Sequence, residues 1–80
     1  HFHQSGASMH ELTLPEDSPV IGELVTDIEL PPHTVLAAIL RDYRPITPDR
    51  DERFERGDEL IFLTAREGES SLKELPLIFT

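Results

Sequence analysis

The stretch of residues 34–63 constrains the fold more than any other part of this chain. Residues 34–40 form an apolar run with a β-branched start, and residues 59–64 form a second run that is apolar after its first residue. Between them lie a polar break, a stiff segment with two prolines, and the charged stretch 49–58. Short apolar runs bounded by turn residues are typical of strands. The pattern predicts a small β-rich module and favours a binding or regulatory role over catalysis.

Length and charge set limits on the partners of the chain. A chain of 80 residues forms one small domain that buries only ~60% of its unfolded surface, and dimerisation is a common source of added stability at this size. The sequence has no cysteine for a disulfide, a thiolate nucleophile or a cysteine-based metal site. Its 16 acidic residues outnumber 7 basic ones, and the formal charge of −9 disfavours nucleic acid and anionic membranes. No apolar run approaches the ~20 residues that span a bilayer, so we expect no direct membrane insertion.

The beginning of the chain differs from the rest. Residues 1–9 carry small and polar side chains without periodicity, so we expect a tag remnant or disordered leader there and the folded domain at residues 10–80. A metal site formed by His1, His3 and His10 is the alternative, although no acidic or cysteine partner accompanies them in the leader.

A strand and then a helix are expected next. Residues 10–14 alternate between polar and apolar side chains, as a short strand does. Ser18 and Pro19 suit a helix start, and the pair Pro31-Pro32 ends the helix because the residue before a proline avoids the helical region. Apolar side chains between these limits recur with helical spacing at Val20, Ile21, Leu24, Val25 and Ile28.

Turn residues organise the C-terminal half. We expect a positive φ at Gly57 in the turn before the second apolar run. A last short helix carries Leu72 and Leu75 on one face and ends at Pro76. The apolar tail 77–79 is expected to pack on the sheet, and a stub exposed by truncation is the alternative.

The element order is therefore β-α-β-β-β-α. This order predicts a small α+β fold in which two short helices lie on one face of a mixed sheet.

Residue patterns of catalysis are missing from the sequence. It contains no Gly-x-Ser-x-Gly, no His-Glu-x-x-His and no phosphate-binding loop, and no nucleophile–base pair that a hydrolase or transferase would need. We therefore expect no enzyme. The acidic side chains of residues 49–59 are dense enough to suggest a cation site, but they do not follow the calcium-loop pattern. Because three arginines are interleaved with them, a self-neutralised surface loop is favoured over a metal site.

Four further side chains are candidates for ligand contacts. His33, just before the long strand, is either a pH sensor or an exposed turn residue. Tyr43 is placed either to stack on a planar ligand or to cover the sheet edge. Arg41 and Arg44 flank this tyrosine, and salt bridges to local acids are favoured over a phosphate or carboxylate ligand.

Five pieces of the sequence, taken in order, resemble the TrkA-C domain family. They are Ser-Pro-Val-Ile-Gly at residues 18–22, Asp27-Ile28, Val-Leu-Ala-Ala-Ile-Leu-Arg at 35–41, Pro-Ile-Thr-Pro at 45–48 and Phe-Glu-Arg-Gly-Asp-Glu-Leu-Ile-Phe at 54–62. The family forms the C-terminal half of RCK-type regulators of potassium channels and cation transporters. The resemblance covers residues 11–79.

The resemblance implies a non-enzymatic, cytoplasmic regulatory domain. Such a domain forms a homodimer, binds a small effector or ion near the dimer interface, and biases the gate of a membrane potassium or cation channel or transporter. The alternative is a ligand-free dimerisation or docking module of a larger antiporter or transporter. The sequence lacks the Gly-x-Gly-x-x-Gly of the nucleotide-binding half that often precedes this domain, so no NAD and no other cofactor is expected.

We expect any ligand where the first helix meets the long strand. The predicted site residues are Asp27, Ile28, Leu30, His33 and Val35. The two prolines of this junction stiffen it and leave backbone groups available, and apolar walls beside a carboxylate and an imidazole suit a small molecule. Family members that resemble cyclic di-AMP receptors carry a basic residue after the Asp-Ile pair. Glu29 follows that pair here, so a cation or a neutral ligand is favoured; an ordinary junction without ligand is the alternative.

Overall fold

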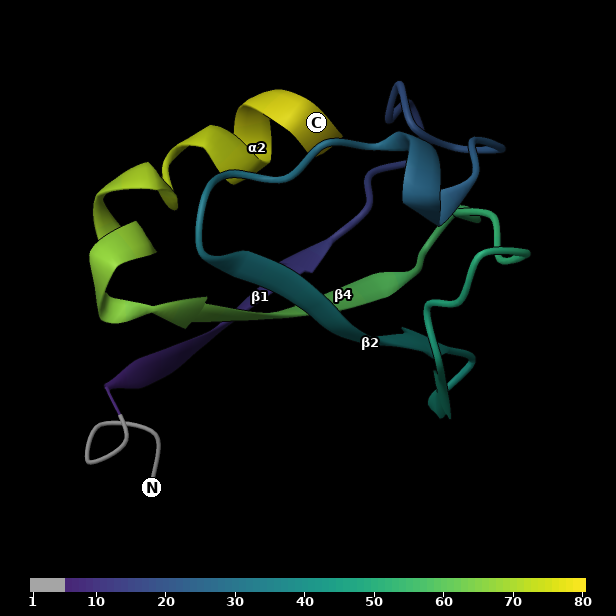
Figure 1. Cartoon of the computed structure of the whole chain (residues 1–80). Coiled ribbons are helices and arrows are strands. Elements are labelled where there is room, and N and C mark those ends of the chain that lie inside the picture. The colour runs from purple at the N-terminus through teal and green to yellow at the C-terminus, as the bar shows by residue number, and fades with distance from the viewer. Residues whose placement is uncertain (1–5) are drawn as a thin grey trace.

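Four strands form one antiparallel sheet (Figure 1). The structure is a computed structural model that describes residues 6–80. Its strands are β1 (Ala7–Thr13), β2 (Thr34–Arg41), β3 (Arg44–Ile46) and β4 (Glu59–Ala65), and their order in the sheet is β1-β4-β2-β3. The α+β class is confirmed, but the mixed sheet is corrected to an antiparallel one. A parallel pair needs a crossover connection, and none of the helical segments joins strands that are neighbours in the sheet.

The helical segments are short and lie over one face of the sheet (Figure 1). They are the 3-10 turns η1 (Val25–Asp27) and η2 (Arg66–Ser71) and the helix α2 (Glu74–Phe79). With η1 in the place of the first helix, the element order matches the predicted β-α-β-β-β-α. Leu75 and Phe79 are four positions apart on α2, so they share one face of the helix, and both are fully buried in the core.

The predicted first helix is wrong except for the single turn η1. Gly22 adopts φ +87°, a left-handed conformation that interrupts a right-handed helix. The backbone N–H groups of Gly22 and Val25 donate to the carbonyls of Phe54 and Glu52, at 2.8 and 2.9 Å, instead of to carbonyls four residues earlier. The many β-branched residues of this segment also lower its helix propensity. The loop 52–54 therefore takes the hydrogen bonds that a helix would have made.

Pro76 does not end the last helix, as the sequence predicted, but lies within α2. It sits in the first turn, where the missing N–H of proline has no partner to lose. The helix therefore continues through residues 77–79, whose packing is confirmed in part. Phe79 is buried and Ile78 packs against the core, whereas the side chain of Leu77 is 82% exposed.

The strand and turn predictions are confirmed with shifted limits. The first strand begins at Ala7 rather than at His10. The turn between β2 and β3 lies at Asp42 and Tyr43, and Gly57 has the expected positive φ, +80°. Residues 7–9 of the predicted leader 1–9 thus belong to β1. Residues 1–5 of that leader lie outside the described residues, as do His1 and His3 of the metal hypothesis that also included His10.

The core fills the space between the sheet and the helical segments. Leu60 and Phe62 of β4 and Ile39 of β2 point into it and are fully buried. Phe79 of α2 contacts the ring of Phe62 and meets the ring of Phe54 edge-on, both at centroid distances of 5.5 Å. The core thus holds the loop 52–54 and the helix α2 on the same face of the sheet.

Candidate functional site

The residues predicted to form a ligand site lie around the η1–β2 junction. Asp27 ends η1 and is exposed to solvent. Ile28 and Leu30 are half-buried and pack against the core. His33 is exposed and adopts φ +60°, a conformation that costs about 1 kcal/mol or more for a non-glycine residue. Histidine at this position thus forms part of an exposed, strained turn before β2.

Val35 does not join this group. Its side chain is 57% exposed, while its strand neighbours Thr34 and Leu36 face the core, so Val35 points to the opposite face of the sheet. The structure therefore brings Ile28 and Leu30 onto the core but separates Val35 from them.

The backbone of the junction is also less available than the two prolines suggested. The carbonyl of Pro32 accepts a hydrogen bond from Thr34 Oγ1 at 3.1 Å, and the carbonyl of His33 accepts one from the N–H of Ala65 at 2.9 Å. Gly68 of η2 lies against the same turn, since a Cβ added there would be 2.6 Å from the Pro32 carbonyl oxygen. The carbonyls of Pro32 and His33 thus already have hydrogen-bond partners, whereas the side chains of Asp27 and His33 are exposed.

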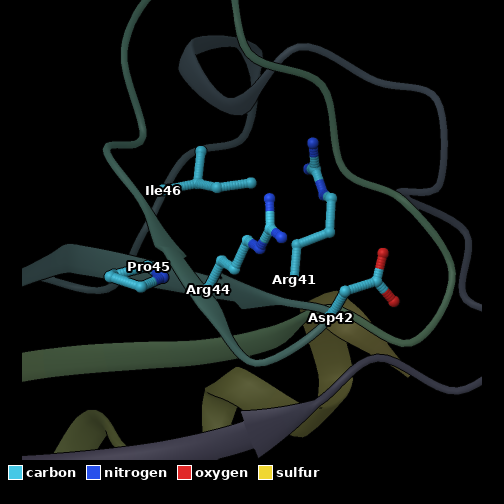
Figure 2. Close-up of a pocket in the computed structure, with 5 residues that line it drawn as sticks. All are labelled: Arg41, Asp42, Arg44, Pro45 and Ile46. Carbon is cyan, nitrogen blue, oxygen red and sulfur yellow. The ribbon is translucent and has the colours of Figure 1, made fainter.

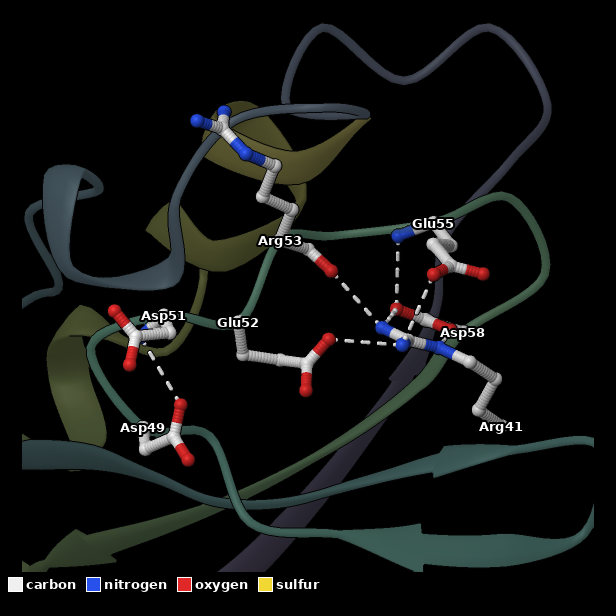
Figure 3. A network of polar contacts seen from close by, with 7 residues as sticks. All are labelled: Arg41, Asp49, Asp51, Glu52, Arg53, Glu55 and Asp58. Carbon is white, nitrogen blue, oxygen red and sulfur yellow. Dashed lines mark hydrogen bonds and ion pairs between the residues drawn. The ribbon is translucent and has the colours of Figure 1, made fainter.

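Arg41, at the end of β2, binds an acidic cluster (Figure 3). Its Nε and Nη2 donate to the two carboxylate oxygens of Asp58, each at 2.9 Å. Its Nη1 donates to Glu52 Oε2 at 2.8 Å and forms an ion pair with Glu55 Oε2 at 3.0 Å, and its Nη2 also donates to the carbonyl of Arg53 at 2.9 Å. Four hydrogen bonds and one ion pair therefore engage all three nitrogens of the guanidinium, whose five N–H groups are mostly used within the protein.

Asp58 is the buried member of this acidic cluster. The carboxylate of Asp58 is fully buried and also accepts the backbone N–H of Glu55 at 2.9 Å. The hydrogen bonds that Arg41 donates to Asp58 raise the pKa of Arg41, the bond that it donates to Glu52 adds to this, and desolvation opposes them. Arg41 therefore stays cationic wherever the domain is folded. We call Arg41, Glu52, Glu55 and Asp58 the Arg41 cluster.

The prediction that the arginines of the loop 49–58 neutralise its own carboxylates is wrong, because the cation that pairs with these carboxylates is Arg41. Each ion pair among residues 6–80 involves Arg41, which comes from the sheet rather than from the loop 49–58. Arg53 instead donates from Nη1 to the carbonyl of Gly22 at 2.7 Å. The described residues contain no group of three or more His, Asp or Glu side chains arranged to hold a metal ion.

A hollow opens beside the hairpin between β2 and β3 (Figure 2). It encloses about 560 Å³ and is lined by Arg41, Asp42, Arg44, Pro45 and Ile46. The guanidinium groups of Arg41 and Arg44 lie on the same side of this hairpin as Ile46 (Figure 2). Tyr43 at the tip is 96% exposed, and thus does not cover the sheet edge as one of the two predictions held.

The sheet face away from the helices is apolar. Leu63 of β4 lies directly between its partners Met9 of β1 and Val35 of β2. The rows on either side pair Ala7 with Ala65, and Ile61 with Ala38. Met9 and Val35 are 51% and 57% exposed, and we call these seven residues the outer apolar face. Sequence reasoning missed this face because it described the run 59–64 only as apolar and did not assign its alternate side chains to the two faces of a sheet.

Comparison with known proteins identifies the fold class first. A solved chain described as "Structure of RCK domain with cda" superposes with a TM-score of 0.67 at 22% identity, covering 84% of this chain and 94% of that one. The domain thus has the fold of an RCK domain. Among the described residues, no helix has the length and apolar character needed to cross a membrane.

Residues 9–76 match the TrkA-C domain, and the chain belongs to this family. Two curated relatives, both named Trk system potassium uptake protein TrkA, come from Mycobacterium tuberculosis strains CDC 1551 / Oshkosh and ATCC 25618 / H37Rv. Each is 41% identical over 76 residues, which cover 95% of this chain and 34% of the relative. The chain therefore spans about a third of the length of the curated relatives it matches.

Proposed function

We propose that this chain is the regulatory domain of a potassium or cation uptake system and acts without catalysis. In this proposal it lies in the cytoplasm beside a channel or transporter subunit, pairs with a second copy, and binds a small effector or ion. The observation that carries the proposal is the 41% identity, over 95% of the chain, to relatives named as Trk potassium uptake proteins. The described residues supply a binding surface and a tightly held charge cluster, which suit regulation.

The outer apolar face supports pairing with a second copy. Its central row, Met9, Leu63 and Val35, exposes contiguous apolar surface to water, as interaction faces do. Two acidic side chains also lie on this face, both on the same side of the central row: Glu11 beside Ile61, and Glu59 one row further along. A two-fold axis that crosses the strands at Leu63 would bury the apolar rows of both copies and keep the two acidic ends apart. Such a pairing is the isologous type that homodimers use.

The effector is proposed to bind at the η1–β2 junction, through Asp27, Ile28, Leu30 and His33 of the predicted set. The fifth predicted residue, Val35, begins the same strand but lies on the outer apolar face, so the junction lies near the edge of the proposed dimer interface. Asp27 and Glu29 place two exposed carboxylates there, which favours a cation or a neutral molecule over an anion. The RCK domain named with cda makes cyclic di-AMP a necessary ligand to test.

An effector regulates only if it binds two arrangements of the dimer with different affinities. Binding beside the interface would meet this condition, because the two copies contribute contacts that change with their relative orientation. The second candidate is a ligand-free dimerisation module. The outer apolar face supports this candidate equally, and it requires no ligand at the junction.

Sedimentation and NMR titration test these proposals separately. The 80-residue chain should sediment as a dimer at micromolar concentration, and Leu63→Glu should make it a monomer because it buries a charge in the interface. Leu77→Glu is the matched control, since Leu77 is 82% exposed on α2 and lies away from this face. A monomeric wild-type chain, or a Leu63→Glu variant that still dimerises, would refute the pairing.

Titration of labelled protein with magnesium, calcium and cyclic di-AMP tests the effector site. Chemical-shift changes at Asp27, His33 and Val35 would support the regulatory reading. A dimer in which none of these ligands moves the junction resonances would favour the ligand-free module instead.

A further inference from the structure

The segment that contains η1 has little regular structure of its own. Residues 18–30 form turns and the single 3-10 turn η1, so their placement depends on contacts with other segments. The main backbone contact is an irregular antiparallel pairing with residues 52–54. Gly22 donates to Phe54, Val25 donates to Glu52, and Phe54 donates back to Glu23, at 2.8 to 3.0 Å. We call this pairing the 22–25/52–54 ladder.

Arg41 anchors the second side of this ladder to the sheet. It holds Glu52 through the side chain, at 2.8 Å, and Arg53 through the backbone carbonyl, at 2.9 Å. The same guanidinium is fixed to the fully buried Asp58 by two bonds. Arg41 itself ends β2, whose partner β4 is the central strand of the sheet. A continuous set of polar contacts thus runs from β2 through Arg41 to residues 52 and 53 and on to η1.

We propose that Arg41 is a positioning residue that sets the location of η1 relative to the sheet. Apolar contacts hold this segment in part. Val20, at its beginning, is buried in the core, whereas Val25, Ile28 and Leu30, in and after η1, are only half-buried. Directional hydrogen bonds to a guanidinium fix both distance and orientation.

The link to regulation rests on the function proposed above, because η1 carries Asp27 of the proposed effector junction. Through Arg41, a displacement of η1 on ligand binding would be transmitted to the end of β2 and to the hollow beside it. The positioning role itself does not depend on any ligand.

Hydrogen exchange of the labelled chain tests the positioning role. Arg41→Lys keeps the charge but offers one compact ammonium group that cannot reach all of these acceptors. The amides of Gly22, Val25 and Phe54 should lose at least about tenfold in protection, the equivalent of one charged hydrogen bond. The amides of β4 that pair with β1 and β2 should change by a clearly smaller factor.

Two further variants separate positioning from general stabilisation. Arg44→Lys is the control, because Arg44 is exposed and makes no ion pair among the described residues, and it should leave the ladder amides unchanged. Glu52→Gln removes one charge from the Arg41 cluster while keeping the shape of the side chain. This variant replaces Arg41→Lys in the exchange experiment if Arg41→Lys does not fold. An equal loss of protection in the ladder and in β4, or no loss in the ladder, would overturn the proposal. A wild-type chain that binds none of the tested effectors, with the expected exchange pattern in Arg41→Lys, would count against the proposed function and leave the positioning role standing.

Discussion

Replacing Tyr43 by glycine should stabilise this domain, although it removes a large aromatic side chain. Asp42 and Tyr43 form the two-residue turn between β2 and β3 and have φ values of 52° and 65°. Both values belong to the left-handed region that the type I′ hairpin turn demands and that glycine adopts freely. The tyrosine therefore occupies a position whose backbone suits glycine.

The size of the effect follows from the exposure of the side chain. Tyr43 is 96% exposed, so its removal forfeits almost no buried surface. A left-handed conformation costs an L-residue ~1–2 kcal/mol, which glycine avoids. The greater backbone entropy of glycine in the unfolded state destabilises the folded variant by ~0.5–1 kcal/mol and so offsets part of this gain. The net gain is about 0.5–1 kcal/mol, which raises the midpoint of thermal unfolding by about 2–8 °C in a domain of this size.

Tyr43→Ala is the matched control in thermal and chemical unfolding. Alanine removes the ring but keeps Cβ, so it leaves the backbone strain in place and should not stabilise. If Tyr43→Gly proved no more stable than Tyr43→Ala, the strain argument would be refuted. If both variants lost stability, the ring would be shown to make contacts that the structure of one chain does not contain, as an interface with a second copy would supply.

Two glycines of the chain should also respond to substitution, each for a different physical reason. Gly57 has φ +80° and no atom within 4 Å of an added Cβ, so Gly57→Val should destabilise by more than ~1 kcal/mol through backbone strain alone, and an unchanged midpoint in chemical denaturation would contradict this. Gly68 has an ordinary φ, but an added Cβ would lie 2.6 Å from the carbonyl oxygen of Pro32. Gly68→Ala should therefore destabilise by ~1–3 kcal/mol and shift the NMR signals of His33, whereas a loss of stability without any shift at His33 would mean that η2 moves instead of the junction.

The strands could be predicted from the sequence because each is a short local pattern with clear limits. The runs that became β2 and β4 are apolar and β-branched, and their limits are set by the Asp42-Tyr43 turn and by Gly57. Such signals involve neighbours only, so no knowledge of the tertiary structure is needed.

The first helix could not be predicted correctly because its pattern is ambiguous. Val20, Leu24 and Ile28 recur every four residues, as on a helix, and Val20 is indeed buried. The conformation is decided instead by the left-handed Gly22 and by hydrogen bonds to residues 52–54, some thirty positions away. Tertiary contacts thus override a local periodicity, as they often do for weak helix formers.

The Arg41 cluster shows the same limit for the candidate site. The sequence favoured salt bridges for Arg41, but its partners Glu52 and Asp58 are 11 and 17 positions away. Only the hairpin between β2 and β3, and the return of the chain along β4, place these carboxylates around one guanidinium. The composition of the loop indicated charge neutralisation, and the topology decided which cation provides it.

The sequence of β4 indicates that both faces of this strand are covered by other groups. Leu60 and Phe62 alternate with Ile61 and Leu63, so the strand is apolar on both faces, as strands covered on both sides are. The helical segments of residues 6–80 cover the face that holds Leu60 and Phe62 (Figure 1). The face that holds Ile61 and Leu63 is extended by Met9 and by Val35, both more than half exposed. An antiparallel sheet that only faced water there would carry polar side chains at these positions, so the sequence of β4 supports the proposed pairing with a second copy.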